Sequence, residues 1–169
     1  TRLAEYQLYQ HKINIPKTRH QAQDCPTWMQ TSFNLFDQLK KTGCVAYPQP
    51  EEARQYMEVN AFAAFAVLLG TRPFTKSSLE GRLQRQLILS DLGLDIPDAM
   101  RVFEEITRYR LMQGILDLDG LYTHPELDAL VAAYTAWRAI HQTRKITLLG
   151  DPDEGQIVLP AVGLKKAYR

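Results

Sequence analysis

Two stretches without charge set the strongest constraint on how this chain folds. One is Ala61–Leu69, which is small and apolar throughout, and the other is Ala129–Trp137, inside a helical pattern that runs from Pro125 to about Gln142. A surface helix carries polar residues on its outer face, so we expect both helices to be covered on most of their circumference. Neither stretch approaches the ~20 residues of a membrane span. The sequence therefore predicts two core helices in a single domain of 169 residues.

The spacing of apolar residues predicts four further helices. Their expected ranges are Thr1–His11, Trp28–Lys41, Ser77–Gly93 and Pro97–Gly114. Two helices begin with a Ser or Thr that is followed three residues later by Glu, at Ser77 and at Thr123. This spacing is typical of a capping box. Lys12–Thr27 has two prolines and a polar middle, so we expect a loop there.

Four short strands are expected between these helices. They are Cys44–Ala46, Tyr56–Val59, Ile146–Leu149 and Gln156–Leu159. The turn Gly150–Gly155 is rich in acids but lacks the twelve-residue pattern of a calcium loop, so we interpret it as a β-turn. Helices outnumber strands, and the expected fold class is α/β.

The charge balance and the cysteine count exclude several classes of protein. Twenty Lys and Arg residues against nineteen Asp and Glu residues give a net charge of +1, so nucleic-acid binding would need a local basic patch. Cys25 and Cys44 are too few for a disulfide scaffold, and with His11 and His20 they lack the spacing of a zinc site. No signal peptide is recognisable. We expect a soluble cytoplasmic protein without a membrane partner.

Glu58 is the first of two acids that stand where the pattern calls for apolar residues. It lies in a strand that leads directly into the apolar helix at Ala61, and such a strand is usually central in an α/β layer. An ionised carboxylate there costs roughly several kcal/mol unless it is paired or bound to a metal. The alternative is an edge strand that turns Glu58 towards solvent.

Asp128 is the second acid of this kind. It lies near the start of the helix that begins at Pro125, beside Ala132 and Thr135 on a face of small residues. We expect this carboxylate to point into a cleft. The alternative is a first-turn acid that the helix dipole favours. The neighbouring Glu126, by contrast, is explained by its capping box.

Glu58 and Asp128 together suggest metal chemistry. Mg²⁺ and Mn²⁺ take hard oxygen ligands, and carboxylates on rigid elements can hold two ions for phosphoryl chemistry. If both acids serve such a site, their carboxylates should lie within ~8 Å of each other. A basic run, Lys76, Arg82 and Arg85, is expected to bind the phosphate of a substrate. The alternative for this run is a solvated helix face.

Several segments, in this order, resemble one family. They are Tyr56–Val59, Lys76–Arg85, Leu127–Ala136 and Gly150–Pro160, of which the last is the most specific. They resemble the family catalogued as domain of unknown function 429, whose members are regarded as predicted nucleases of the ribonuclease-H-like fold. The resemblance covers most of the chain.

The resemblance implies a metal-dependent nuclease that cuts phosphodiesters of nucleic acid. Glu58 matches the family's acid on a central strand, and Asp128 is similar to the last-helix acid of ribonuclease-H-like resolvases. The implied cofactor is Mg²⁺ or Mn²⁺, held by these two carboxylates. Lys76, Thr135 and the turn Asp151–Glu154 match motif positions to which the resemblance gives no role.

Two departures from the family pattern bear on activity. Members usually begin with strands that carry a first aspartate, which this chain lacks, and Pro125 stands where they often carry an acid. We therefore expect the C-terminal portion of a ribonuclease-H-like domain, from a longer protein. One alternative is a non-catalytic nucleic-acid- or protein-binding module that retains the scaffold without a complete acid set. Another is an interaction domain whose exposed sheet edge pairs with a second copy, giving a homodimer.

Overall fold

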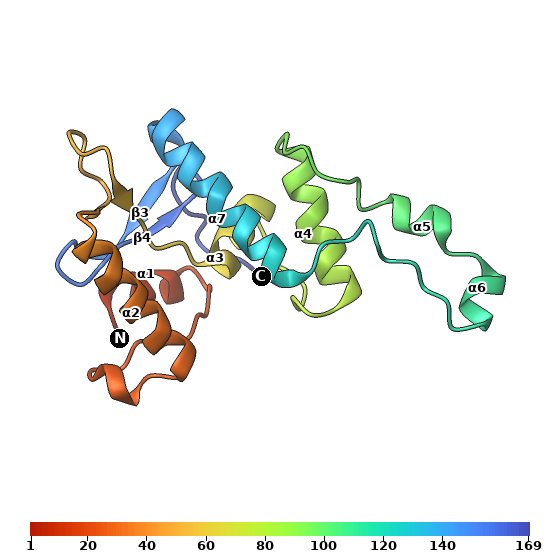
Figure 1. Cartoon of the computed structure of the whole chain (residues 1–169), viewed down its shortest axis with the longest axis horizontal. Helices are drawn as coiled ribbons and strands as arrows, with labels where there is room; N and C mark the ends of the chain where they lie inside the picture. The colour runs from red at the N-terminus through yellow and green to blue at the C-terminus, as the bar shows by residue number, and fades with distance from the viewer.

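Seven α-helices and four short strands make up the chain, and the computed structural model describes all residues from 1 to 169 (Figure 1). The helices are α1 (Leu3–Gln10), α2 (Thr27–Lys41), α3 (Ala61–Leu69), α4 (Leu79–Asp91), α5 (Arg101–Glu105), α6 (Arg108–Met112) and α7 (His124–His141). The strands are β1 (Val45–Ala46), β2 (Gln55–Tyr56), β3 (Thr147–Leu149) and β4 (Ile157–Leu159). The mixture of helices with a few short strands is compatible with the expected α/β class. None of the helices is long and apolar enough to cross a membrane.

The strands form two small ladders that one backbone bridge joins. β1 and β2 pair in parallel, and β3 and β4 pair antiparallel. Beyond β2, Glu58 bridges to Ile157 of β4, and the backbone N–H of Val158 donates to the carbonyl oxygen of Glu58 at 2.9 Å. The extended segment from Gln55 to Glu58 therefore lies between β1 and β4. At Glu58 itself the backbone pairs only with β4, and the regular strand ends earlier than expected, so Glu58 lies where the segment has one neighbouring strand and its side chain is 30% exposed.

Helix α3 is the covered core helix that its apolar sequence predicts. Its residues belong to two buried clusters, one with α1, β3 and β4, the other with α4 and α7. The side chain of Asn60 caps the helix by accepting from the N–H of Ala63 at 3.0 Å. Gly70 ends it in the left-handed region with φ of 71°, which glycine adopts without strain.

Helix α7 is buried along one stripe, partly buried on both flanks of it and exposed along the opposite stripe. Its buried residues, Leu127, Val131, Thr135 and Ala139, follow a four-residue spacing and face α3 and α4. Ala133, Trp137 and other residues on the opposite side are exposed. Between Leu127 and Ala139 only Ala129, Ala133 and Trp137 are exposed, so most of the circumference is at least partly covered, as expected. Its outer stripe lacks charge, but alanines and single apolar side chains are ordinary on protein surfaces.

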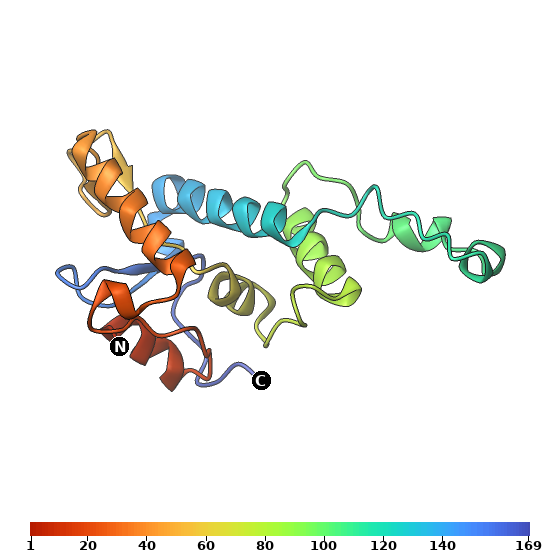
Figure 2. The same ribbon diagram turned by 60° about the horizontal axis from the view of Figure 1, so that its bottom comes forward.

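The expected helix Pro97–Gly114 is broken into α5 and α6. Ile106 has extended backbone, and the side chain of Thr107 accepts from the N–H of Arg110 at 3.2 Å to start α6. A Thr side chain that caps a new helix competes with continuation of the old one. The segment that carries α5 and α6 projects from the rest of the chain as an arm (Figures 1 and 2), and its base packs on α4, where Ala99, Val102 and Leu121 form a buried cluster with Leu83.

One of the two expected capping boxes is confirmed. At α7, Glu126 accepts from the N–H of Thr123 at 2.7 Å. These bonds lower the pKa of the Glu126 carboxyl. At α4 the predicted cap is displaced by one residue, because Ser78 and not Ser77 accepts from the N–H of Gly81 at 3.1 Å.

Candidate functional site

A wide groove of about 1210 Å³ runs between α2, the middle of α7 and the segment from Ala46 to Asn60. The residues of α2 that line it include Trp28, Phe33 and Phe36, and the tyrosines 47 and 56 line it from the strand region. The rings of Phe36 and Tyr56 lie 5.3 Å apart between centroids. Alanines of α7 line it further along. The groove is large enough for a ligand of several rings.

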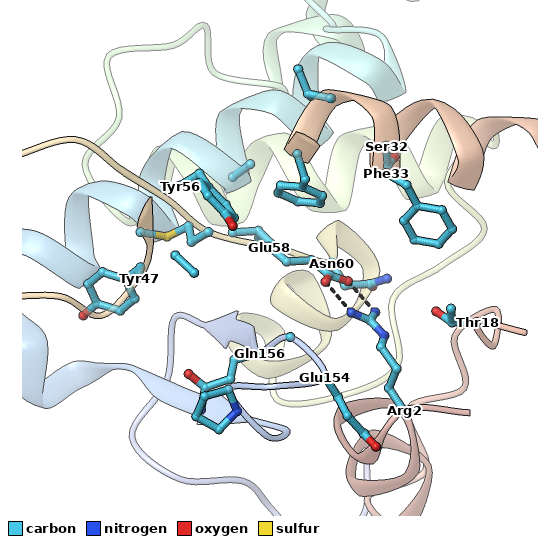
Figure 3. A pocket seen from close by; sticks show the side chains of 18 of the residues that line it. Arg2, Thr18, Ser32, Phe33, Tyr47, Tyr56, Glu58, Asn60, Glu154 and Gln156 are labelled. Carbon is cyan, nitrogen blue, oxygen red and sulfur yellow. Dashed lines mark hydrogen bonds and ion pairs between the residues drawn. The ribbon is translucent and has the colours of Figure 1, made fainter. Parts of the chain in front are cut away.

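Glu58 lies in this groove and is paired with Arg2 (Figure 3). The guanidinium of Arg2 donates through Nη1 to Glu58 Oε2 at 2.6 Å and through Nη2 to Oε1 at 2.7 Å. Such a bidentate pair is among the stronger ion pairs, and it raises the pKa of Arg2 further above its ordinary value. The Glu58 side chain remains 30% exposed. One guanidinium therefore occupies both oxygens of a carboxylate that solvent reaches.

Glu5 holds the other side of the same guanidinium but is a structural residue. Its side chain is 1% exposed and accepts from Arg2 Nε at 3.1 Å and from the backbone N–H of Thr18 at 3.0 Å. Burial by itself would raise the pKa of Glu5, but hydrogen bonds from Thr18 and Arg2 outweigh it and lower the pKa. These bonds fix the loop after α1 to the first turn of α1.

Acidic side chains outnumber basic ones in the groove. Five carboxylates line it, those of Glu5, Asp37, Glu58, Asp153 and Glu154, against the two cations Arg2 and Lys40. Glu154 accepts from the N–H of Leu3 at 2.9 Å. The acid-rich loop between β3 and β4 is a turn, as expected, with the N–H of Asp153 donating to Asp151 Oδ1 at 2.8 Å. The groove therefore carries net negative charge.

Asp128 lies in different surroundings from Glu58. It is half-buried on α7, makes no hydrogen bond or ion pair, and does not line the groove. Burial raises the pKa of its carboxyl, against the opposing charges of Lys76, Arg85 and His124. Glu58 is not among the charges that act on it. Thr135, about two helical turns further on, is buried and donates to the carbonyl oxygen of Val131 at 2.7 Å.

Two of the three predicted phosphate ligands are engaged inside the fold. Arg85 is 1% exposed and donates through Nη1 to the carbonyl oxygens of Phe74 at 3.0 Å and Gly81 at 2.8 Å. Arg82 donates through Nε to the carbonyl oxygen of Tyr122 at 2.8 Å. Neither the solvated-face alternative nor an open phosphate site describes them. Lys76 is exposed and has no intramolecular partner.

Gly81 explains why Arg85 is buried. A Cβ at Gly81 would lie 1.9 Å from the carbonyl oxygen of Thr75, so the turn before α4 packs directly on the helix backbone. The guanidinium of Arg85 fills the space under this turn, 5.3 Å from the centroid of the Phe65 ring. No property of the basic run indicates this close approach, because it depends on how the turn folds back.

The residues around Glu58 fit a single divalent cation better than a preformed site for two metal ions shared with Asp128. No group of three or more His, Cys, Asp or Glu side chains could hold a metal ion, so Glu58 and Asp128 do not form a closed centre. The carboxylate of Glu58 nevertheless has the hard oxygens that Mg²⁺ prefers, and the Arg2 guanidinium stands there as a cation. Mg²⁺ is often held by one or two carboxylates together with waters and substrate phosphates. Sequence reasoning missed Arg2, for which the only local signal was its three-residue spacing from Glu5.

The fold and the groove define a helix-rich protein with short strands and an acidic, aromatic-lined groove. A family model described as Protein of unknown function (DUF429) matches residues 4–154. The chain belongs to this family, as the motif segments predict. Neither the curated proteins nor the solved structures gave a match.

Proposed function

We propose that this chain is a metal-dependent phosphodiesterase of the ribonuclease-H-like fold that acts on nucleic acid, with Mg²⁺ or Mn²⁺ held at Glu58. The observation that carries the proposal is the Glu58 carboxylate, which lies on a central extended segment, faces a ligand-sized groove and is neutralised by one guanidinium. When bound, the ion supplies Lewis-acid polarisation of a phosphoryl oxygen. Membership of the family supports the scaffold without assigning the activity.

The net negative charge of the groove supports the proposal that a divalent cation takes part in binding a phosphodiester. Three more carboxylates than cations line it, and a phosphodiester would be repelled unless a divalent ion lay between. Arg2 suits a second role once an ion releases it from Glu58, because guanidinium binds phosphate with two parallel hydrogen bonds. Lys76 is the exposed cation of the predicted run that remains free to contact phosphate.

Asp128 is proposed as the second functional carboxylate. It lacks any intramolecular partner, and burial raises its pKa, which is the direction required of an acid–base group. Its neighbours Lys76 and His124 are charged or titratable, so the end of α7 that carries it is polar. Glu126 is used by its cap.

The test is a calorimetric titration of Mg²⁺ and Mn²⁺ into the chain and its Glu58→Gln and Asp128→Asn variants, with cleavage of labelled DNA and RNA oligonucleotides measured in parallel. We expect binding that is lost in Glu58→Gln and cleavage that is lost in both variants and in EDTA. Glu51→Gln, an exposed acid in the turn before β2, is the matched control. Equal binding by the wild type and Glu58→Gln would refute the assignment.

A non-catalytic binding module is the second candidate. The excess of carboxylates and the aromatic walls of the groove favour a basic, apolar protein segment as its ligand. This candidate predicts binding in EDTA that Glu58→Gln weakens, and no cleavage under any condition.

Self-association belongs to this second candidate. β1 and β3 each pair on one side only, and such edges can pair with a second copy. We therefore propose a homodimer, which light scattering after gel filtration tests directly. A monomer at all concentrations would count against it.

A further inference from the structure

Three segments that lie far apart in the sequence and carry exposed cations are joined by hydrogen bonds. The segments are residues 9–17, 70–72 and 164–169, and none of them contains Asp or Glu. Their exposed cations include Lys12, Lys17, Arg72, Lys165 and Lys166, and we call these five the basic face. With a net charge of only +1 for the chain, this concentration of one sign is a property of the fold.

Backbone hydrogen bonds hold the three segments together. The N–H of Tyr168 donates to the carbonyl oxygen of His11 at 3.0 Å, and His11 Nδ1 lies 2.7 Å from the carbonyl oxygen of Lys165. Lys165 Nζ in turn donates to the carbonyl oxygen of Gly70 at 2.9 Å. Figure 2 shows the C-terminal segment passing beside the loop that follows α1. The segments that carry the cations are therefore held together before any ligand binds.

An exposed aromatic ring lies among these cations. Tyr9 is 51% exposed, and the ammonium groups of Lys12 and Lys17 lie 5.9 Å and 5.5 Å from its ring centroid. Aromatic rings beside cations suit single-stranded nucleic acid, whose bases stack while its phosphates pair. An anionic membrane is less favoured, because Ala4 and Leu8 of α1 are buried and the side chains that α1 exposes, Leu3, Tyr6 and Tyr9, include a single aliphatic one.

We propose that the basic face binds the backbone of a single-stranded nucleic acid, with Tyr9 stacking on a base, and leads the strand into the groove that contains Glu58. Lys17 stands between Pro16 and Thr18, which both line the groove, so the two surfaces adjoin. The part of this inference that makes the nucleic acid a substrate rests on the proposed phosphodiesterase activity. The binding step itself needs neither Glu58 nor a metal ion.

The experiment measures binding of a fluorescein-labelled oligo-dT of about 20 nucleotides to the whole chain by anisotropy, in EDTA and at several salt concentrations. Five cations on single-stranded DNA predict a slope of about −3.5 in log affinity against log salt, or a loss of about 100-fold between 50 and 200 mM. Replacing one cation from each segment, with Lys17→Gln, Arg72→Gln and Lys166→Gln together, should reduce the slope to about −1.4 and weaken low-salt binding at least tenfold. The matched control replaces the exposed Lys41, Arg144 and Lys145 and should leave both values unchanged.

Three results would show that the basic face is not a binding site for single-stranded nucleic acid. An equal loss in the control variant, no binding to the oligonucleotide, or binding to phosphatidylserine vesicles without binding to the oligonucleotide would overturn the proposal. Tyr9→Leu should weaken binding about threefold or more without changing the salt slope. Binding in EDTA that survives Glu58→Gln while cleavage is absent would refute the hydrolase proposal alone. Cleavage with unchanged affinity in the triple variant would refute the basic face alone.

Discussion

The ion pair between Arg2 and Glu58 is the most informative place to perturb the site. Two unit charges about 4 Å apart attract by about 4 kcal/mol at an effective dielectric constant near 20. The side chains are 21% and 30% exposed, so lost hydration and side-chain freedom offset much of this. A net contribution of about 1–2 kcal/mol to the unfolding free energy remains for a bidentate pair of this exposure.

The same free energy opposes the proposed metal ion. An ion must displace the guanidinium, and about 1.4 kcal/mol corresponds to a tenfold change in apparent affinity. Arg2→Met should therefore bind Mg²⁺ about 5- to 30-fold more tightly than the wild type, while its unfolding free energy falls by about 1–2 kcal/mol. Arg2→Lys keeps the charge but loses the paired hydrogen bonds, and should lie between the two.

Calorimetric titration gives the ion affinities, and urea unfolding followed by circular dichroism gives the stabilities. Arg54→Met, which removes an exposed arginine in the turn before β2, controls for the loss of one positive charge. A folded Arg2→Met protein with unchanged Mg²⁺ affinity would refute the competition between guanidinium and ion. A loss of stability well above about 3 kcal/mol would instead show that the tie to Glu5 dominates.

Three further predictions follow from the charged residues inside the fold. Arg85→Met should lower the unfolding free energy by about 2–4 kcal/mol in urea, because the carbonyl of Phe74 loses its donor, whereas Lys76→Met should change it by less than about 0.5 kcal/mol. Because the pKa of Glu5 is lowered in the fold, this residue contributes stability at pH values above its ordinary pKa of 4.5, and the contribution is lost as pH falls through the folded pKa. Glu5→Gln should therefore flatten the acid limb of a curve of unfolding free energy against pH. The raised pKa of Asp128 has the opposite sign, with stability lost as pH rises through it, so Asp128→Asn should gain up to about 1 kcal/mol at pH 7 by thermal unfolding.

Helix boundaries could be predicted wherever their signals are local. Thr123 and Glu126 cap α7 through groups three residues apart, and Gly70 ends α3 by a backbone conformation that glycine favours. The arm is not predicted from the sequence, because the apolar spacing of residues 97–114 continues across Thr107, and in the prediction that spacing outweighs the preference of Thr for a helix cap. The strands also depend on partners far along the chain, which is why β2 is shorter than its apolar pattern suggests.

The residues of the site likewise could be predicted only where their signal is local in the sequence. Glu58 could be singled out because burying an ionised carboxylate at the junction of a strand and an apolar helix costs free energy, whatever the rest of the fold. Its partner could not, since Arg2 lies 56 positions away and belongs by sequence to a separate helix start. Arg82 and Arg85 show the converse error, because a basic run looks the same in sequence whether its side chains meet solvent or backbone carbonyls.

A nearly neutral chain thus carries an acidic groove beside a basic face, and under the two proposals this separation makes metal and nucleic acid bind cooperatively. A strand held at Lys17 brings phosphates to carboxylates that repel them, so the ion at Glu58 gains phosphate ligands and the strand gains a counter-charge. Coupling of this kind is reciprocal, and factors of about 5- to 150-fold are usual. Repeating the Mg²⁺ titration with oligo-dT present should therefore give a tighter ion affinity in the wild type and a smaller gain in the triple variant. Equal ion affinities with and without the oligonucleotide would mean that the groove and the basic face serve different ligands.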